Sequence, residues 1–137
     1  QFEAFKALPR DTPIHMLNLV RFKDKATYIA DHRFAEWDMS GADAYAMYGK
    51  ESAPVFGRVG GRIVWRATME AMLIGPDGER WDAIFVAEYP NAGAFLEMVT
   101  DPVYREAVKH RQAAVRTSRL IRCSPGGSGS GGFASEV

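Results

Sequence analysis

The chain has 137 residues, 47% hydrophobic and 25% charged, a composition typical of one soluble globular domain. Lys and Arg together number 17, as do Asp and Glu, and this balance argues against non-specific binding of nucleic acid. No apolar run approaches the roughly 20 residues that span a membrane, and the single cysteine, Cys123, allows no disulfide within the chain. We therefore expect a cytoplasmic protein with no nucleic-acid or membrane partner.

The N-terminal part of the chain predicts one buried strand. Residues 1–13 are interpreted as an N-terminal extension, since their pattern indicates neither a core strand nor a signal peptide. IHMLNLVRF (14–22) is apolar and lies between Pro13 and polar residues, as expected of a strand. The next segment, 23–39, is interpreted as a loop insertion with a short helical turn. It carries three aromatic residues among charges: Tyr28, Phe34 and Trp37.

A helix and two strands are predicted in the middle of the chain. Apolar residues at helical spacing follow the N-cap candidate Ser40 and end at Gly60–Gly61. RIVWRATMEAMLI (62–74) and WDAIFVAEY (81–89) both have the composition of strands. Between them, Pro76-Asp77-Gly78 suits a three-residue hairpin loop. That register places the following residues opposite each other: Arg66 and Glu88, Thr68 and Val86, Trp65 and Tyr89.

The C-terminal part predicts two helices and a last strand. Asn91 is a candidate N-cap for a helix over 92–99, and Asp101-Pro102 starts a second helix that ends near Arg116. SRLIRC (118–123) is the last predicted strand, so the domain spans 14–123. Residues 124–137 are rich in Gly and Ser and form a tail, whose Phe133 we expect to dock on an apolar surface of its own chain, a dimer partner or a lattice neighbour.

The order strand-helix-strand-strand-helix-strand predicts the α+β class, with a ferredoxin-like βαββαβ fold and an antiparallel sheet. A sheet with one wet face should alternate apolar and polar residues along its strands. HMLNLV and AIFVA do not alternate cleanly. Both faces of the central strands should therefore be covered, one by helices and the other by a second copy of the chain, which predicts a homodimer.

Two stretches, VFGRVGGRIVWRA and FVAEYPNAGAFLEMVTDPVYREAVKHR, resemble the bacterial family named domain of unknown function 1330, and Asn18 on the first strand fits its pattern. The resemblance covers 14–22 and 40–122, and 23–39 is longer than the family pattern suggests. It implies a dimeric α+β barrel, in which two ferredoxin-like sheets face each other. The wider superfamily includes cofactor-free monooxygenases, haem-degrading enzymes, isomerases and binding proteins.

Glu88, Arg66 and Asn18 are the main candidates for a functional site. In the predicted register a carboxylate and a guanidinium face each other across the hairpin, and the family position of Asn18 completes the row in an otherwise apolar interior. Two interpretations stay open. The row is either a small-molecule site, catalytic or only binding, or the structural ion pair of a non-catalytic dimeric domain.

Tyr104 and His110 are secondary candidates on the last helix. Histidine titrates near neutral pH, so His110 is a candidate general base or haem ligand, although a surface histidine is the simpler interpretation. Some haem-degrading enzymes of the superfamily combine a histidine, an asparagine and a tryptophan, for which this chain offers His110, Asn18 and Trp65. The histidines show no metal-ligand spacing. We therefore expect no cofactor and no metal, with a cofactor-free or haem-type monooxygenase as a lesser alternative.

Overall fold

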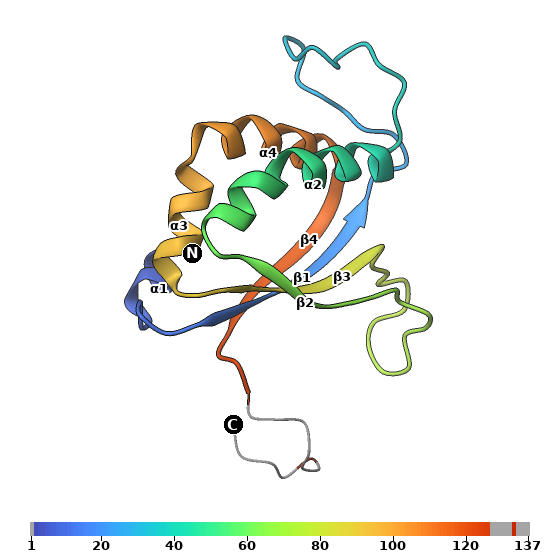
Figure 1. Ribbon diagram of the computed structural model, residues 1–137. Coiled ribbons are helices and arrows are strands. Elements are labelled where there is room, and N and C mark those ends of the chain that lie inside the picture. Colours follow the sequence, from blue (N-terminus) through green and yellow to red (C-terminus); the bar gives the residue numbers. More distant parts are fainter. Residues whose placement is uncertain (1, 127–132, 134–137) are drawn as a thin grey trace.

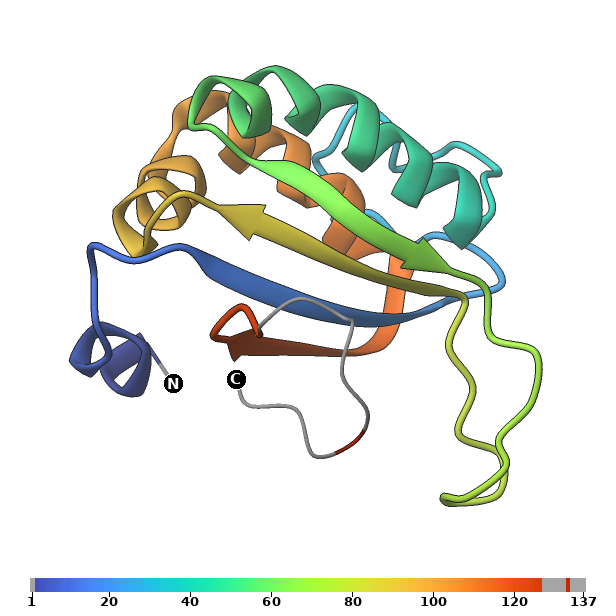
Figure 2. The same ribbon diagram turned by 60° about the horizontal axis from the view of Figure 1, so that its bottom comes forward.

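The computed structural model describes residues 2–126 and residue 133. Four antiparallel strands form one sheet in the order β2-β3-β1-β4. Figures 1 and 2 show helices α2, α3 and α4 together on one face of this sheet. The predicted α+β, ferredoxin-like architecture is confirmed. The elements are α1 (Phe2–Ala7), β1 (Ile14–Phe22), α2 (Gly41–Arg58), β2 (Arg62–Ala67), β3 (Ala83–Tyr89), α3 (Ala92–Thr100), α4 (Pro102–Ala114) and β4 (Val115–Cys123).

The three long helices begin at side-chain caps that the sequence predicts. Ser40 accepts a hydrogen bond from the Asp43 amide at 3.0 Å, and Asn91 accepts one from the Ala94 amide at 2.8 Å. Asp101 accepts from the Val103 amide at 2.7 Å and precedes Pro102 at the first position of α4. Each cap satisfies amides that have no partner within their own helix, which fixes where the helix starts.

The main core lies between the helices and the sheet. Ile14, Met16, Ala87 and Tyr89 point from β1 and β3 toward the helices and are buried. They pack against α3 and α4, including Phe95, Met98 and Tyr104. Because side chains alternate along a strand, His15, Leu17 and Leu19 lie on the opposite face, which we call the open face. No helix covers that face in Figures 1 and 2.

The register of β2 and β3 differs from the prediction. Arg62 lies opposite Glu88, and Arg66 lies opposite Phe85, with an irregularity between Ile63 and Trp65. The predicted pairing of Arg66 with Glu88 is therefore wrong. The strand β2 ends at Ala67 instead of 74, and the connection to β3 is the long loop 68–82 instead of a tight hairpin. The bulge adds one residue to β2, which reverses the facing of every later side chain.

The segment 23–39, which we call the strap, crosses from β1 to α2 without a helix or strand of its own. The Lys23 and Thr27 amides donate hydrogen bonds to the Ala114 and Ala113 carbonyls, at 2.8 and 3.0 Å. A Cβ at Gly41 would lie 2.1 Å from the Lys23 carbonyl oxygen, so only glycine fits where the strap passes the start of α2. Single turns, and not a regular helix, connect these anchored points.

The described residues before β1 and after β4 lie outside the sheet. Helix α1 packs Phe5 on Phe95, with their ring centroids 5.4 Å apart, so part of the predicted extension 1–13 is helical. Most of the predicted Gly/Ser tail lies outside the described residues. Phe133 is described and fully exposed, so the predicted docking on its own chain is wrong, whereas docking on a partner stays a prediction.

Candidate functional site

A pocket of about 450 Å³ lies between α2 and the ends of β2 and β3. Tyr45, Tyr48 and Gly49 of α2 line one side, and Arg66 and Phe85 line the sheet side. The two sheet residues are direct partners across β2 and β3, which explains why they meet here. Aromatic rings with one guanidinium group suit a small ligand that has an apolar body and an anionic group.

One of the two tyrosines that line this pocket, Tyr48, is held by a hydrogen bond. The hydroxyl groups of Tyr48 and Tyr104 lie 2.8 Å apart. Burial, and then the neighbouring Tyr104, raises the pKa of Tyr48 far above its usual range, and burial also raises the pKa of Tyr45. Both hydroxyls are therefore protonated at neutral pH and are suited to donate hydrogen bonds. Tyr104, predicted as a candidate, reaches the pocket only through Tyr48.

Asn18 lies on the same sheet face as Arg66, two strands further in. It is the partner of Phe85 on β1, so Arg66, Phe85 and Asn18 form one row across three strands. The Asn18 amide donates a hydrogen bond to the Met16 carbonyl at 3.0 Å. The structure thus places Asn18 and Arg66 on one face, as predicted, with Phe85 between them. Glu88 does not join them.

Glu88 lies on the open face, in a polar row that sequence reasoning missed. His15 Nε2 is 2.9 Å from Glu88 Oε2, and Arg62 Nε donates to Glu88 Oε1 at 2.8 Å. The hydrogen bond from His15, and next the one from Arg62, lower the pKa of Glu88 below its usual range. Cys123 is the partner of His15 on β4 and extends the row to the far edge of the sheet. The row lies at one end of the open face.

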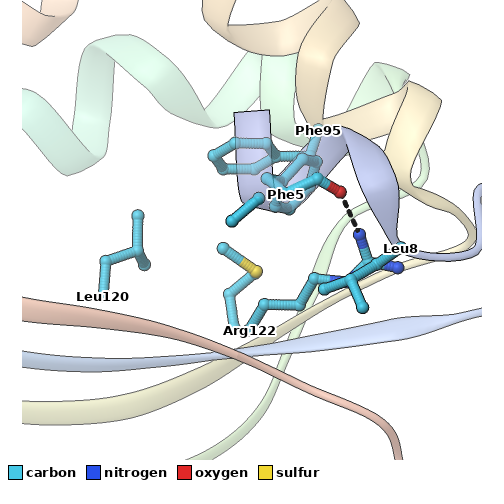
Figure 3. A pocket seen from close by; sticks show the side chains of 7 residues that line it. Phe5, Leu8, Phe95, Leu120 and Arg122 are labelled. Carbon is cyan, nitrogen blue, oxygen red and sulfur yellow. Dashed lines mark hydrogen bonds between the residues drawn. The ribbon is translucent and has the colours of Figure 1, made fainter. Parts of the chain in front are cut away.

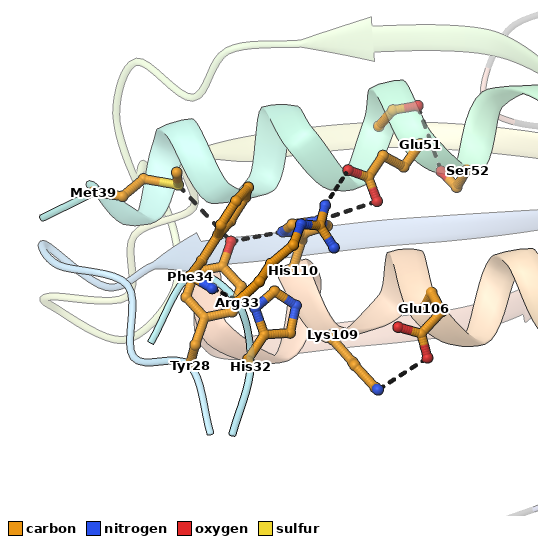
Figure 4. A network of polar contacts seen from close by, with 11 residues as sticks. Tyr28, His32, Arg33, Phe34, Met39, Glu51, Ser52, Glu106, Lys109 and His110 are labelled. Carbon is orange, nitrogen blue, oxygen red and sulfur yellow. Dashed lines mark hydrogen bonds and ion pairs between the residues drawn. The ribbon is translucent and has the colours of Figure 1, made fainter. Parts of the chain in front are cut away.

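A second polar cluster lies beneath the strap, around His110 (Figure 4). His110 is fully buried, with Nδ1 2.7 Å from the Tyr28 hydroxyl and Nε2 3.1 Å from Glu51 Oε1. The Nε2 contact has the distance of an ion pair without the geometry of a hydrogen bond. Arg33 Nη2 donates to the other oxygen of Glu51 at 3.2 Å. The simpler interpretation of His110 as a surface histidine is wrong, because the strap covers it.

The cluster also shifts the pKa of two strap residues. Burial lowers the pKa of His32, and the neighbouring His110 lowers it further. Burial, followed by the charge of Glu51, raises the pKa of Tyr28. The rings of His32 and Tyr28 stack with their centroids 4.6 Å apart. These neutral rings, with the buried Phe34, form the aromatic cover of His110.

The residues do not fit the haem site considered from the sequence. Trp65 pairs with Val86 on the open face, Asn18 lies on the helix face, and His110 is enclosed with its Nδ1 bound to Tyr28. A ligand of haem iron needs a free ring nitrogen facing a cavity. No group of three or more His, Cys, Asp or Glu side chains is placed to hold a metal ion within the described part of the chain. Within the same residues, no helix is long and apolar enough to cross a membrane.

A further apolar pocket of about 400 Å³ lies under α1 (Figure 3). Phe5 of α1 and Leu8, which follows the helix, face Phe95 and Leu120 across it. Arg122 closes one end, since its guanidinium donates to the Phe5 carbonyl at 3.0 Å and also to the Pro9 carbonyl. Its charge therefore anchors α1 to the sheet, and the remaining lining is almost entirely apolar.

The sequence held partial signals for the missed residues. Even-numbered residues of β1 face the core, so His15 faces the other way. It meets Glu88 only because β1 and β3 pair in the observed register. Arg62 follows Gly60-Gly61 directly and starts β2. Glu51 lies on α2, but only the path of the strap brings Tyr28 to the same place as Glu51 and His110.

The comparisons with known proteins agree with this fold. The chain is 56% identical to the RPA0582 protein of unknown function from Rhodopseudomonas palustris, covering 90% of each chain with a TM-score of 0.83. A methylated RPA0582 structure gives 55% identity, 93% and 91% coverage and a TM-score of 0.86. No curated protein matches the chain.

More distant structures share the fold alone. SnoaB, a cofactor-independent oxygenase from Streptomyces nogalater, is 12% identical over 88% of this chain and 99% of its own, with a TM-score of 0.55. A dabb family protein with a ferredoxin-like fold from Mesorhizobium loti is 15% identical over 84% and 98%, with a TM-score of 0.51. The family model described as a domain of unknown function (DUF1330) matches residues 32–122. The chain belongs to the DUF1330 family.

Proposed function

We propose that the protein is a homodimer that binds a small molecule in the pocket between α2 and the β2–β3 edge of the sheet. The observation that carries the ligand site is Arg66. Its guanidinium lines a pocket walled by Tyr45, Tyr48 and Phe85, and none of the ion pairs among the described residues involves it. An unpaired guanidinium beside aromatic walls favours an aromatic or apolar molecule with a carboxylate or a similar anion.

The open face of the sheet supports the dimer. Leu17, Leu19, Ile84 and Val86 lie on it in the two central strands and are only partly buried in the single chain. Trp65 adds a side chain that is 52% exposed. Contiguous exposed apolar surface of this kind typically marks an interface. A second sheet packed on this face would complete the predicted α+β barrel, with a specific interface of at least roughly 1,200 Å².

Binding is favoured over catalysis at this pocket. Tyr45 and Tyr48 hold their protons firmly, so they can orient a ligand by hydrogen bonding but are poor general bases. Asp82, the carboxylate in the lining, already accepts a hydrogen bond from the Phe22 amide at 2.7 Å. The alternative, a non-catalytic dimeric domain with no ligand, predicts that this pocket binds nothing.

The pocket is tested with salicylate as a probe, because it combines an aromatic ring with a carboxylate. Titration into the ¹⁵N-labelled protein should shift the backbone amide signals of Tyr45, Gly49 and Phe85. Gly49→Phe should abolish these shifts, since a Cβ at Gly49 meets no atom within 4 Å and a larger side chain there reaches into the pocket. Arg66→Gln should weaken binding by about tenfold, the loss of one charge-assisted hydrogen bond.

A matched control is available on the same helix. A Cβ at Gly57 also meets no atom within 4 Å, but Gly57 does not line the pocket. Gly57→Phe should therefore bind salicylate like the wild type. Shifts confined to the pocket under α1, around Leu120, or no shifts at all would overturn the proposed site.

A further inference from the structure

The loop between β2 and β3, residues 68–82, exposes an apolar tip. Leu73 and Ile74 are 91% and 94% exposed, more than any other large apolar side chain between residues 2 and 126. Residues 62–74 have the composition of a strand, yet their pairing with β3 ends at the Ala67–Ile84 pair. In the described chain, no backbone amide from residue 69 to 75 donates a hydrogen bond. The tip thus presents apolar side chains and unpaired backbone together.

The base of this loop is fixed on the open-face side of the sheet. Arg21 lies two residues after Leu19 on β1 and therefore on the same open face. It donates from Nη1 to the Gly78 carbonyl at 3.4 Å. The guanidinium of Arg119, the partner of Leu19 on β4, lies 5.5 Å from the ring centroid of Trp81. Figure 2 shows the loop extending away from the sheet on the side opposite the helices.

We propose that residues 68–82 form an arm that packs against the partner subunit, with Leu73 and Ile74 in contact with that subunit. This inference rests on the proposed dimer. A second copy is the occupant that the structure favours, because the arm projects beyond the same apolar face that the partner sheet would cover. Burying both side chains there removes the two most exposed apolar groups of residues 2–126 from water.

The free backbone of the arm supports the same partner. Extended segments with unpaired amides and carbonyls readily add to another sheet edge or segment. Met69, Ala71 and Leu73 recur at every second position of the sequence, the spacing that would share one side if the segment became a strand on binding. In a dimer with two-fold symmetry the contact occurs twice, so each apolar side chain contributes two buried positions.

The test compares Leu73→Glu/Ile74→Glu with Val103→Glu. Val103 is 56% exposed on α4, on the helix side of the sheet, and serves as the matched control. Sedimentation equilibrium at several protomer concentrations gives the dimer dissociation constant. The arm variant should raise this constant at least tenfold, and Val103→Glu should leave it unchanged. Leu73 and Ile74 are almost fully exposed and Val103 is more than half exposed, so circular dichroism of both variants should match the wild type.

A second measurement reports the arm directly. In a Cys123→Ser background, Ile74→Cys carries the only thiol, and its reaction with 5,5′-dithiobis(2-nitrobenzoic acid) should be several-fold slower in the dimer than after dilution to monomer. The arm contact alone would be overturned if the wild type is a dimer, the arm variant has the same dissociation constant, and the thiol of Ile74→Cys reacts equally fast in dimer and monomer. A wild type that is monomeric at micromolar concentration would overturn the proposed dimer. Sedimentation of the wild type with phosphatidylcholine vesicles, lost in the arm variant, would assign the tip to a lipid surface and overturn the arm contact.

Discussion

Two histidine–glutamate contacts occupy opposite sides of the sheet, and they differ mainly in burial. His110 Nε2 lies 3.1 Å from Glu51, and His15 Nε2 lies 2.9 Å from Glu88. The carboxylates are similar, with Glu51 29% and Glu88 25% exposed, but the His110 side chain is completely buried whereas that of His15 is 26% exposed. Similar distances therefore join the same two residue types in different surroundings.

The difference teaches that the environment, and not the pair, sets the energy. Exposed ion pairs contribute little, typically less than about 1 kcal/mol, because water and salt screen them. A buried polar ring has no water to replace a lost partner, so its removal or disruption costs more. The contact beneath the strap should thus contribute more to the free energy of unfolding than the contact on the open face.

The largest effect is expected from His110→Ala. The change removes a fully buried ring, its hydrogen bond with Tyr28 and its contact with the aromatic cover, and should lower the free energy of unfolding by about 2–4 kcal/mol. Urea unfolding at a fixed protomer concentration measures this loss. Lys109→Ala on the same helix, where the ion pair with Glu106 is exposed, should cost at most about 0.5 kcal/mol. Equal stability of both variants would contradict the supporting role of the cluster.

An intermediate effect on stability is expected when the pH is lowered through the titration range of His32. Its folded pKa lies below the ordinary 6.5, so the unfolded chain binds more protons once the pH falls below that value, and the folded state loses stability there. The loss grows as the pH falls from the ordinary pKa to the lowered one and then levels off. His32→Asn keeps an acceptor for the Phe34 amide but does not titrate.

The measurement for His32 is the difference in unfolding free energy between the wild type and His32→Asn from pH 7.5 to 5.5. We expect the wild type to lose stability relative to the variant as the pH decreases. A difference that stays constant over this range would show that His32 titrates as it does in the unfolded chain.

The smallest effect is expected from Glu88→Gln, with a loss below about 1 kcal/mol at pH 7. The folded pKa of Glu88 is lowered, so its contribution is present above the ordinary value of 4.5 and disappears as the pH falls through the folded value. Wild type and variant should therefore converge in unfolding experiments near pH 3. Glu70→Gln, an exposed carboxylate of the arm, is the control. A loss above about 3 kcal/mol would mean that the partner subunit buries the row completely.

Local signals in the sequence were sufficient for the order of the strands and the long helices, but not for α1, which was not predicted, or for the end of β2 at Ala67. The caps at Ser40, Asn91 and Asp101 satisfy amides within three residues of themselves, so each helix start depends only on nearby sequence. The missing alternation in β1 and β3 likewise indicated that both sheet faces carry apolar residues. The order of these elements leaves few topologies, and the ferredoxin-like one is observed.

The candidate site was less predictable, because strand register is not a local property. The observed pairing is offset from the predicted one by three residues at Arg66, which faces Phe85, and the extra residue near Val64 adds a fourth, so that Arg62 faces Glu88. The turn signal at Pro76-Asp77-Gly78 suggested a tight hairpin, but the strands separate at Ala67, far from that turn. Propensity describes single residues, whereas register depends on the packing of both faces at once.

By itself, the sequence determined the order of the strands and the starts of the long helices, since hydrophobic spacing and caps act over a few residues. Only the tertiary structure decided which polar residues meet. His110 has the spacing of any helix residue, and it becomes buried because the strap, anchored at Lys23 and Thr27, carries Tyr28 across it. Contacts between residues 82 positions apart depend on the path of the whole chain, and no short stretch of sequence contains that path.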